Sequence, residues 1–375
     1  MMLRGFSVCA AAVLLLTAAL FAAAGEPAAP QAGDFAKAVE KAIGFLRTKQ
    51  SPDGSFASYS GPGPTSLVVT AVLRHGRSMQ DPLAAKGLEY LEGFVQPDGA
   101  ISLKESLYRN YETSLALICF VEANRDGRYD KLIGDAKRFL KGEQWGGNQE
   151  ADESDPSYGG AGYGKHERPD LSNTQFLIEA LRAAGAGPDD EAIKKALIFV
   201  SRCQNLESEH NTLPFPAKNP DGGFYYTPAA GGQSQAGETP NGGLRSYGSM
   251  TYAGLKSMIH AGVKADDPRV KAAVKWIGRH YDLTSNPGMG QAGLYYYYHT
   301  LAKALDAAEM DYVEDAAGNR HDWRRDLTAE LLKRQAPDGS WANENIRWLE
   351  GESSLVTGYV LLTLAYCKPA ADEGK

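Results

Sequence analysis

Residues 50–56 read QSPDGSF, and two other parts of the chain repeat this pattern: residues 96–101 read QPDGAI and residues 335–341 read QAPDGSW. Each copy follows a stretch with apolar residues at helical spacing. A further Pro-Asp-Gly lies at residues 220–222. Pro-Asp-Gly suits a type I turn, because proline fixes φ at the first corner and glycine takes the exit. The pattern therefore predicts internal repeats, each with a helix that ends in a turn.

A second helix is expected after each turn. Two degenerate turns, at residues 145–147 and 286–288, bring the number of repeats to six. The second helices open with threonine or serine, which we expect to cap their N-termini. We place their starts near Thr65, Thr113, Thr174, Thr251, Thr300 and Thr357.

The two helices of a repeat differ in character. The first is amphipathic, with charged residues such as Lys37, Glu40 and Lys41 on one face, whereas the second is apolar around most of its circumference. Amphipathic helices form a solvated layer, and helices that are apolar all round must be buried. Six such pairs predict an all-α, α6/α6 toroid, in which an inner ring is enclosed by an outer one. An open α-solenoid is the alternative.

The ends of the chain define its expected domains. Residues 1–25 are typical of a signal peptide, with Arg4 before an apolar run at 10–24 and small residues after it. We expect a linker at 26–34, a single toroid domain at 35–367, and a tail at 368–375. The chain is therefore expected to be secreted or periplasmic. No later apolar run is long enough to span a membrane.

Composition limits the partners. The formal net charge is −7 and there is no run rich in lysine and arginine, which argues against nucleic-acid binding. The leader aside, Cys119, Cys203 and Cys367 are too few and too widely spaced for a disulfide framework. We expect buried thiols. Nothing in the pattern indicates an oligomeric state.

The copies at 50–56 and 335–341 resemble the Gln…Gly-x-Trp repeat of squalene and hopene cyclases, and the repeat of protein prenyltransferase β subunits. The resemblance spans about residues 35–367 and implies the toroid fold. In the cyclases, an Asp-x-Asp-Asp-Thr motif opens an inner helix, and its middle aspartate protonates the substrate. Here Asp170 and Thr174 match, but Ser172 stands in place of the acid and Asn173 in place of its neighbour. A serine hydroxyl is too weak an acid for an alkene, so we expect no cyclase activity of that type.

The prenyltransferases hold zinc with an Asp-x-Cys pair and a distant histidine. The segment Tyr298-His299-Thr300 resembles the histidine part, but Tyr247-Gly248-Ser249 stands where the Asp-x-Cys pair is expected. With two of the three ligands missing, zinc has no adequate coordination shell. We therefore expect no metal, and no cofactor.

Candidate site residues follow from the geometry of a toroid, where inner-helix N-termini face a central cavity and favour anions. Each candidate could instead cap a helix or brace a loop. The ligand-binding candidates are Glu112, Ser172, Asn173, Arg245, Tyr247, Trp348, Glu352 and Ser353. The catalytic candidates are Asp170, Tyr298 and His299, since histidine suits acid–base chemistry and a tyrosine hydroxyl can relay protons.

Three functions remain open at this point. The first is a cavity that binds an apolar or mixed-polarity ligand, terpenoid or glycan, which predicts a wall of Phe, Tyr and Trp with few charges. The second is a polysaccharide lyase, which predicts a groove with a tyrosine and a histidine in hydrogen-bond reach and Arg245 nearby. The third is a non-catalytic scaffold, which predicts a filled barrel. Long insertions at 144–170 and 205–246 are expected at the barrel mouth.

Overall fold

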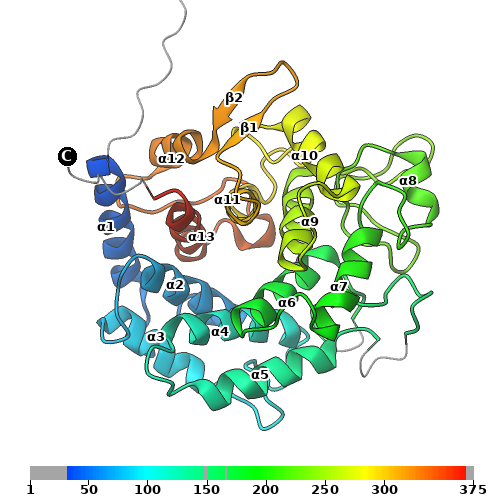
Figure 1. The fold of residues 1–375 in the computed structure, drawn as a ribbon. Coiled ribbons are helices and arrows are strands. Elements are labelled where there is room, and N and C mark those ends of the chain that lie inside the picture. Colours follow the sequence, from blue (N-terminus) through cyan, green and yellow to red (C-terminus); the bar gives the residue numbers. More distant parts are fainter. Residues whose placement is uncertain (1–31, 147–150, 165–166, 369–375) are drawn as a thin grey trace, which may run out of the picture.

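The computed structural model describes residues 32–146, 151–164 and 167–368, so the expected signal peptide lies outside the described residues. The helices form two concentric rings (Figure 1). The inner ring consists of α2 (Gly63–Arg74), α4 (Arg109–Ala123), α6 (Leu171–Ala183), α9 (Gly248–His260), α11 (Leu294–Ala307) and α13 (Ser353–Tyr366). The outer ring consists of α1 (Ala32–Lys49), α3 (Pro82–Glu92), α5 (Asp130–Glu143), α7 (Glu191–Arg202), α10 (Pro268–His280) and α12 (Trp323–Arg334).

The inner ring is closed. Each inner helix packs against the next, α13 packs against α2, and α1 contacts both α12 and α13. The first and last repeats therefore meet, which confirms the predicted all-α toroid over the open solenoid. Small elements decorate the connections: η1 (Ser58–Ser60), α8 (Pro214–Lys218), η2 (Arg347–Leu349) and an antiparallel hairpin of β1 (Tyr312–Glu314) and β2 (Arg320–Asp322).

The repeated Gln-Pro-Asp-Gly motif joins neighbouring outer helices. The Gln335 amide donates to the carbonyl of Gly339 in its own turn and to that of Ala38 on α1, each at 3.0 Å. Gln50, Gln144 and Gln204 make the equivalent pair, with one bond to a carbonyl of the following loop and one to a carbonyl of the next outer helix. The Gln96 amide instead donates to the carbonyls of Phe94 and Ser102 beside its own turn. Gly54 has a φ of 88°, and a Cβ there would lie 2.2 Å from the Lys86 carbonyl oxygen on α3. The motif is therefore a structural clasp, and its last copy closes the ring.

Contrary to the expectation from the sequence, the repeat threonines do not cap the inner helices. The inner helices begin earlier, α2 at Gly63 before Thr65 and α11 at Leu294 before Thr300. Instead, a threonine hydroxyl accepts a hydrogen bond from the backbone of the preceding turn, as Thr65 does from Phe56 at 2.9 Å. Equivalent bonds are made by Thr113, Thr174, Thr251 and Thr357. A threonine that caps a helix and a threonine that accepts a bond from the preceding turn both stand before an apolar run, so the sequence alone does not distinguish these two roles.

Three further expectations can be compared with the structure. Helix α1 begins at Ala32, so residues 32–34 are helical and do not belong to the linker. The thiols of Cys119, Cys203 and Cys367 are free and buried, as expected. Among the described residues, no helix has both the length and the apolar character needed to cross a bilayer.

Candidate functional site

A cavity of about 650 Å³ opens at the end of the barrel where the inner helices begin. Aromatic side chains are the largest group in its wall: Tyr59, Tyr108, Tyr111, Tyr163, Phe176, Tyr226, Tyr247, Tyr296, Trp348 and Tyr359. Aliphatic side chains and methionine add Leu103, Leu107, Met250 and Leu349, and the carboxylates are Glu112 and Glu350. The cavity thus lies at the N-termini of the inner helices, where the candidate site residues were expected.

Both insertions contribute to this cavity. Tyr163 comes from the first, and Tyr226 and Gln235 come from the second. The Tyr163 ring packs edge-on against Tyr108 and Tyr111, with centroids 5.1 and 6.2 Å apart. The predicted place of the insertions, at the barrel mouth, is therefore confirmed, and their tyrosines extend the aromatic wall.

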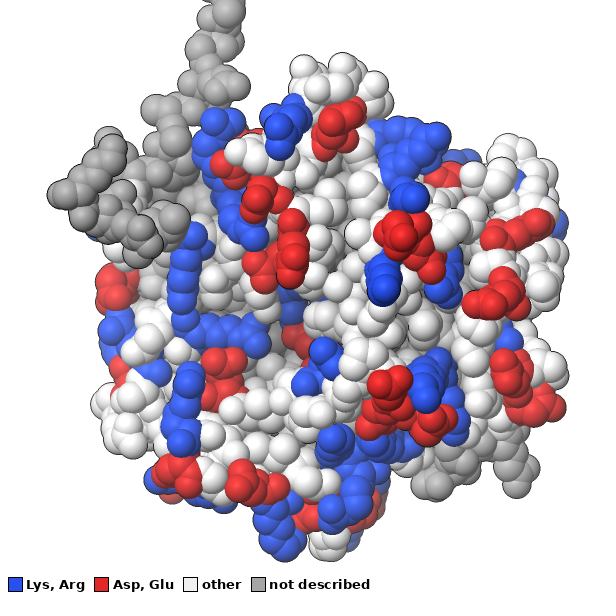
Figure 2. Space-filling view, viewed as in Figure 1, with Lys and Arg blue, Asp and Glu red and all other residues white. Residues whose placement is uncertain are grey.

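Exposed apolar side chains gather around the mouth. Leu107 is 67% exposed and Tyr59 is 72% exposed, and both line the cavity. The other exposed large apolar side chains that line it are Leu103, Tyr108, Trp348 and Leu349. Such groupings mark binding surfaces more often than chance. By contrast, Figure 2 shows acidic and basic side chains interspersed over the face viewed there.

Ser172 and Asn173 line the cavity on the first turn of α6, as predicted. The Ser172 hydroxyl lies 2.9 Å from that of Tyr296. Asp170 is the N-cap of α6, and its carboxylate accepts from the backbone and side-chain amides of Asn173 at 2.8 and 2.7 Å. Burial raises the pKa of Asp170 to about 6, against the opposing effect of those bonds. Asp170 is not among the residues that line the cavity, so its observed role is that of a cap.

Both cavity carboxylates are engaged by neighbouring groups. Glu112 accepts from the Leu103 amide at 3.1 Å and the Ser106 hydroxyl at 2.9 Å. Glu350 accepts from the Tyr296 backbone amide at 2.8 Å and the Asn343 side chain at 2.6 Å, and so caps the start of α11. Burial raises the pKa of both glutamates. Through these hydrogen bonds the two glutamates hold neighbouring segments of the cavity wall in place.

The structure does not form the predicted Tyr298–His299 pair at the cavity. Both side chains are buried and neither lines it. The Tyr298 hydroxyl donates to the Leu283 carbonyl at 2.5 Å. The His299 ring packs against Tyr359, with centroids 5.6 Å apart, and its Nε2 lies 3.4 Å from the Lys303 ammonium. Burial, together with Lys303, holds the pKa of His299 well below its usual value, so its ring is neutral.

The remaining candidates divide between the mouth and its supports. Tyr247 and Trp348 line the cavity, as predicted. Arg245 does not line it: this residue is exposed, and its guanidinium donates to the Glu238 carbonyl at 2.9 Å. Glu352 caps α13 and accepts from the Tyr59 hydroxyl at 3.2 Å, so it supports a wall residue from outside.

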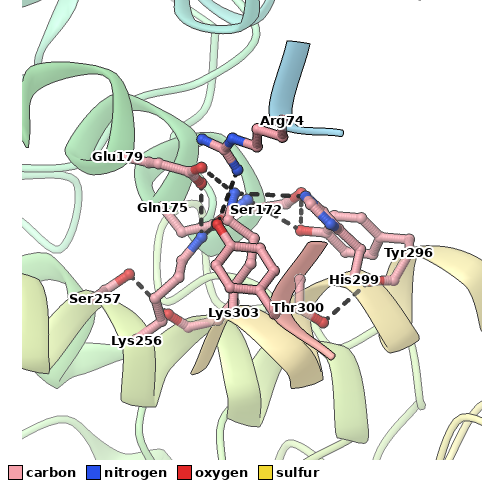
Figure 3. Close-up of polar contacts among 12 residues, drawn as sticks. Arg74, Ser172, Gln175, Glu179, Lys256, Ser257, Tyr296, His299, Thr300 and Lys303 are labelled. Carbon is pink, nitrogen blue, oxygen red and sulfur yellow. Dashed lines mark hydrogen bonds and ion pairs between the residues drawn. The ribbon is translucent and has the colours of Figure 1, made fainter. Parts of the chain in front are cut away.

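A buried charged cluster lies deeper in the barrel (Figure 3), and sequence reasoning missed it. Glu179 on α6 binds Lys256 on α9 through one carboxylate oxygen, at 2.8 Å, and Lys303 on α11 through the other. Burial alone would raise the pKa of Glu179, but the two lysines hold it well below its usual range. Burial lowers the pKa of Lys303 to about 7, opposed by Glu179. The sequence feature that could have indicated this cluster is the presence of charged residues, Glu179, Lys256 and Lys303, within otherwise apolar inner helices.

The chain is similar to several solved structures. A polysaccharide lyase is 10% identical with a TM-score of 0.50, over 89% of this chain and 96% of that one. The type II terpene cyclase MstE from Scytonema is 14% identical with a TM-score of 0.35, over 90% and 98%. A glycosidase is 14% identical with a TM-score of 0.47, over 90% and 99%. No family model and no curated protein matches the chain. The likeness to the polysaccharide lyase supports the fold alone, and at TM-scores below 0.5 the other two carry no argument.

Proposed function

We propose that this chain is a secreted or periplasmic toroid that binds an apolar or mixed-polarity small molecule of the terpenoid class in its central cavity. The supporting observation is the set of exposed apolar side chains at the mouth, led by Leu107 and Tyr59, which continues inward as an aromatic wall. Removing such surface from water is the main driving force for binding an apolar ligand.

The volume of the cavity supports a ligand in preference to a scaffold. A cavity of about 650 Å³ lies within the range of sites that hold small molecules, about 300–1,000 Å³. A non-catalytic scaffold predicts a barrel filled by side chains, which this open cavity does not match. A glycan is the second class of ligand, because tyrosine and tryptophan rings also pack on sugars. The aliphatic residues Leu103, Leu107 and Leu349 at the mouth favour the apolar class.

The placement of the polar groups supports binding without cyclisation or lyase chemistry. Ser172 occupies the cavity position where the cyclase resemblance places an acid, and its hydroxyl cannot protonate an alkene. Tyr298 and His299 do not line the cavity, and Arg245 lies at the surface. Turnover of a linear polyprene by the unaltered protein would contradict this part of the proposal.

The test is displacement of an uncharged fluorescent dye, N-phenyl-naphthylamine, by farnesol, with a xylan oligosaccharide as the alternative competitor. Leu107→Asp should weaken dye binding about tenfold, because the bound dye covers the exposed Leu107 side chain and burying a leucine is worth about 1.5 kcal/mol or more. Ile346→Asp is the matched control: Ile346 is 75% exposed but does not line the cavity. It should change the dye affinity by less than about twofold.

The outcomes separate the alternatives. Displacement by farnesol with loss in Leu107→Asp alone supports the proposal. Displacement by the oligosaccharide alone would replace the terpenoid with a glycan. Equal losses in both variants would mean that the dye reports general surface binding and would overturn the proposed site. Fractionation of cells that express the full chain tests export.

A further inference from the structure

A hydrogen-bond chain connects the cavity to the buried charged cluster (Figure 3). Ser172 and Tyr296 line the cavity, are only partly buried, and have their hydroxyl oxygens 2.9 Å apart. The Gln175 side-chain amide donates to the Tyr296 hydroxyl at 3.4 Å. The Gln175 carbonyl oxygen accepts from the Lys256 ammonium. The chain therefore runs from the cavity, through two hydroxyls and an amide, to a lysine that is 1% exposed.

The lysine fixes the direction of the two bonds made by the Gln175 side chain. An ammonium group has donors only, so Gln175 must present its oxygen to Lys256 and its NH₂ group to Tyr296. The Tyr296 oxygen then accepts, and its own proton is directed to Ser172 or into the cavity. If Ser172 accepts that proton, its own proton is left for the cavity. In either case the end of the chain that faces a ligand is a hydrogen-bond donor.

The net charge of the buried cluster also favours a hydrogen-bond donor at the cavity end of the chain. Two ammonium groups, from Lys256 and Lys303, face the single carboxylate of Glu179, whereas Arg74 has its own partner in Glu122 at 3.0 Å. With Lys303 protonated, the cluster carries one positive charge in excess. Asp170 opposes this potential, but the Asn173 amides engage its carboxylate. Buried charges polarise chains of hydrogen bonds, which strengthens a donor at the far end.

We propose that Ser172 and Tyr296 form a donor subsite for a carbonyl oxygen of the ligand, the oxygen of a ketone or carboxyl group on an apolar skeleton. The inference rests on the proposed function, since it names the polar group of the ligand bound there. A carbonyl oxygen only accepts, so it matches a donor without leaving a proton unpaired. An alcohol of the same shape also brings a proton of its own, and the subsite offers that proton only the remaining lone pair of a hydroxyl oxygen that already takes part in the chain.

The test uses two probes that differ only at this oxygen: farnesylacetone and the secondary alcohol made by reducing its ketone. Their affinities are measured by displacement of N-phenyl-naphthylamine. The unaltered protein should bind the ketone about fivefold more tightly, the value of one typical hydrogen bond. Ser172→Ala combined with Tyr296→Phe, which removes both hydroxyls, should reduce that preference to less than about twofold. Ser257→Ala, which removes a buried hydroxyl bonded to the Ala253 carbonyl, should leave it unchanged.

Gln175→Glu tests the direction of the chain. A carboxylate still pairs with Lys256 but accepts from Tyr296, so Tyr296 turns its proton inward and Ser172 presents an acceptor. The preference should then invert in favour of the alcohol. The added carboxylate also balances the charges of Lys256 and Lys303 against two carboxylates, so we expect the variant to fold. Circular dichroism of the purified variant checks that it is folded. Should this variant fail to fold, the variant that lacks both the Ser172 and the Tyr296 hydroxyls decides the question.

The outcomes distinguish the two levels of the proposal. If neither probe displaces the dye, the proposed function fails, and this inference fails with it. If both displace it with equal affinity, the cavity still binds apolar ligands but the donor subsite is overturned. A ketone preference that persists in the variant lacking both hydroxyls, or in a folded Gln175→Glu, overturns it as well.

Discussion

The inner helices carry two kinds of polar side chain, and they differ in what they bond. Thr251 is fully buried, accepts from the Phe224 amide at 3.1 Å and donates to the Tyr247 carbonyl at 3.0 Å. Ser172 is only partly buried and faces the cavity. A polar group that is fully bonded inside the protein contributes to folding, whereas one that borders a cavity remains available to a ligand. The difference predicts which substitutions damage stability and which damage binding.

The largest loss of stability is expected at Glu179, in the buried layer. Glu179→Gln leaves the ammonium groups of Lys256 and Lys303 buried without a carboxylate, which should lower the free energy of unfolding by about 3–5 kcal/mol. Urea denaturation measures it. Lys303→Met is the control, because it leaves one lysine on one carboxylate and should cost less. Equal losses in the two variants would show that charge balance does not govern this cluster.

Asp170 should produce the next largest effect, and that effect depends on pH. Its pKa is raised in the folded state from 3.8 to about 6. The native state therefore binds this proton more tightly than the unfolded state. The resulting stability is complete below about pH 4 and is lost as pH rises through 6, a change of about 3 kcal/mol.

Asp170→Asn keeps an acceptor at the N-cap but cannot titrate. Its stability relative to the unaltered chain should therefore increase by about 3 kcal/mol between pH 4 and pH 7. Urea unfolding of both proteins across this range measures the difference, which cancels the other titrating groups. A difference that stays flat with pH would mean that Asp170 is not buried as the structure places it.

The threonine clasp should have a smaller effect. Thr251→Val removes the acceptor of the buried Phe224 amide and should cost about 1–3 kcal/mol. Thr300 provides a comparison within the ring, because its hydroxyl bonds only to carbonyls of its own helix, at Tyr296 and Tyr297. Thr300→Val should therefore cost less. Thermal or urea unfolding of the two variants side by side would refute the clasp if their losses were equal.

Much of the fold could be predicted from the sequence because the repeat motif is local. The Gln-Pro-Asp-Gly copies mark outer-helix ends, and the contrast between amphipathic and apolar helices assigns the two rings. Helix starts could not be predicted as well, since Thr300 lies six residues inside α11. A start near Thr300 singled out Tyr298 and His299, but the true start at Leu294 brings Tyr296 to the cavity and buries His299 deeper.

The cavity lies at the end of the barrel where the candidate residues were expected, but only some of them line it. Glu112, Ser172, Asn173, Tyr247 and Trp348 line the cavity as expected. An aromatic wall was expected for a ligand cavity, but most of its members were not identified, because they come from elements far apart in sequence, such as Tyr163 and Tyr226 in the insertions and Tyr359 in α13. No local pattern records that a toroid brings such residues together. Arg245 is a residue type that often binds anionic ligands, but in the structure it is exposed and its guanidinium donates to the Glu238 carbonyl.

The smallest effect on stability is expected at Ser172, where the comparison with the buried layer is sharpest. Ser172→Ala removes one hydroxyl that borders the cavity, and water in the cavity can take its place beside Tyr296, so the free energy of unfolding should change by less than about 0.5 kcal/mol. Thr174→Ala, on the same helix turn but fully buried, removes the acceptor of the Ala161 amide and should cost about 1–3 kcal/mol. Urea denaturation of the pair decides it. Similar losses at both positions would place Ser172 in the structural layer and remove the reason to regard its hydroxyl as available to a ligand.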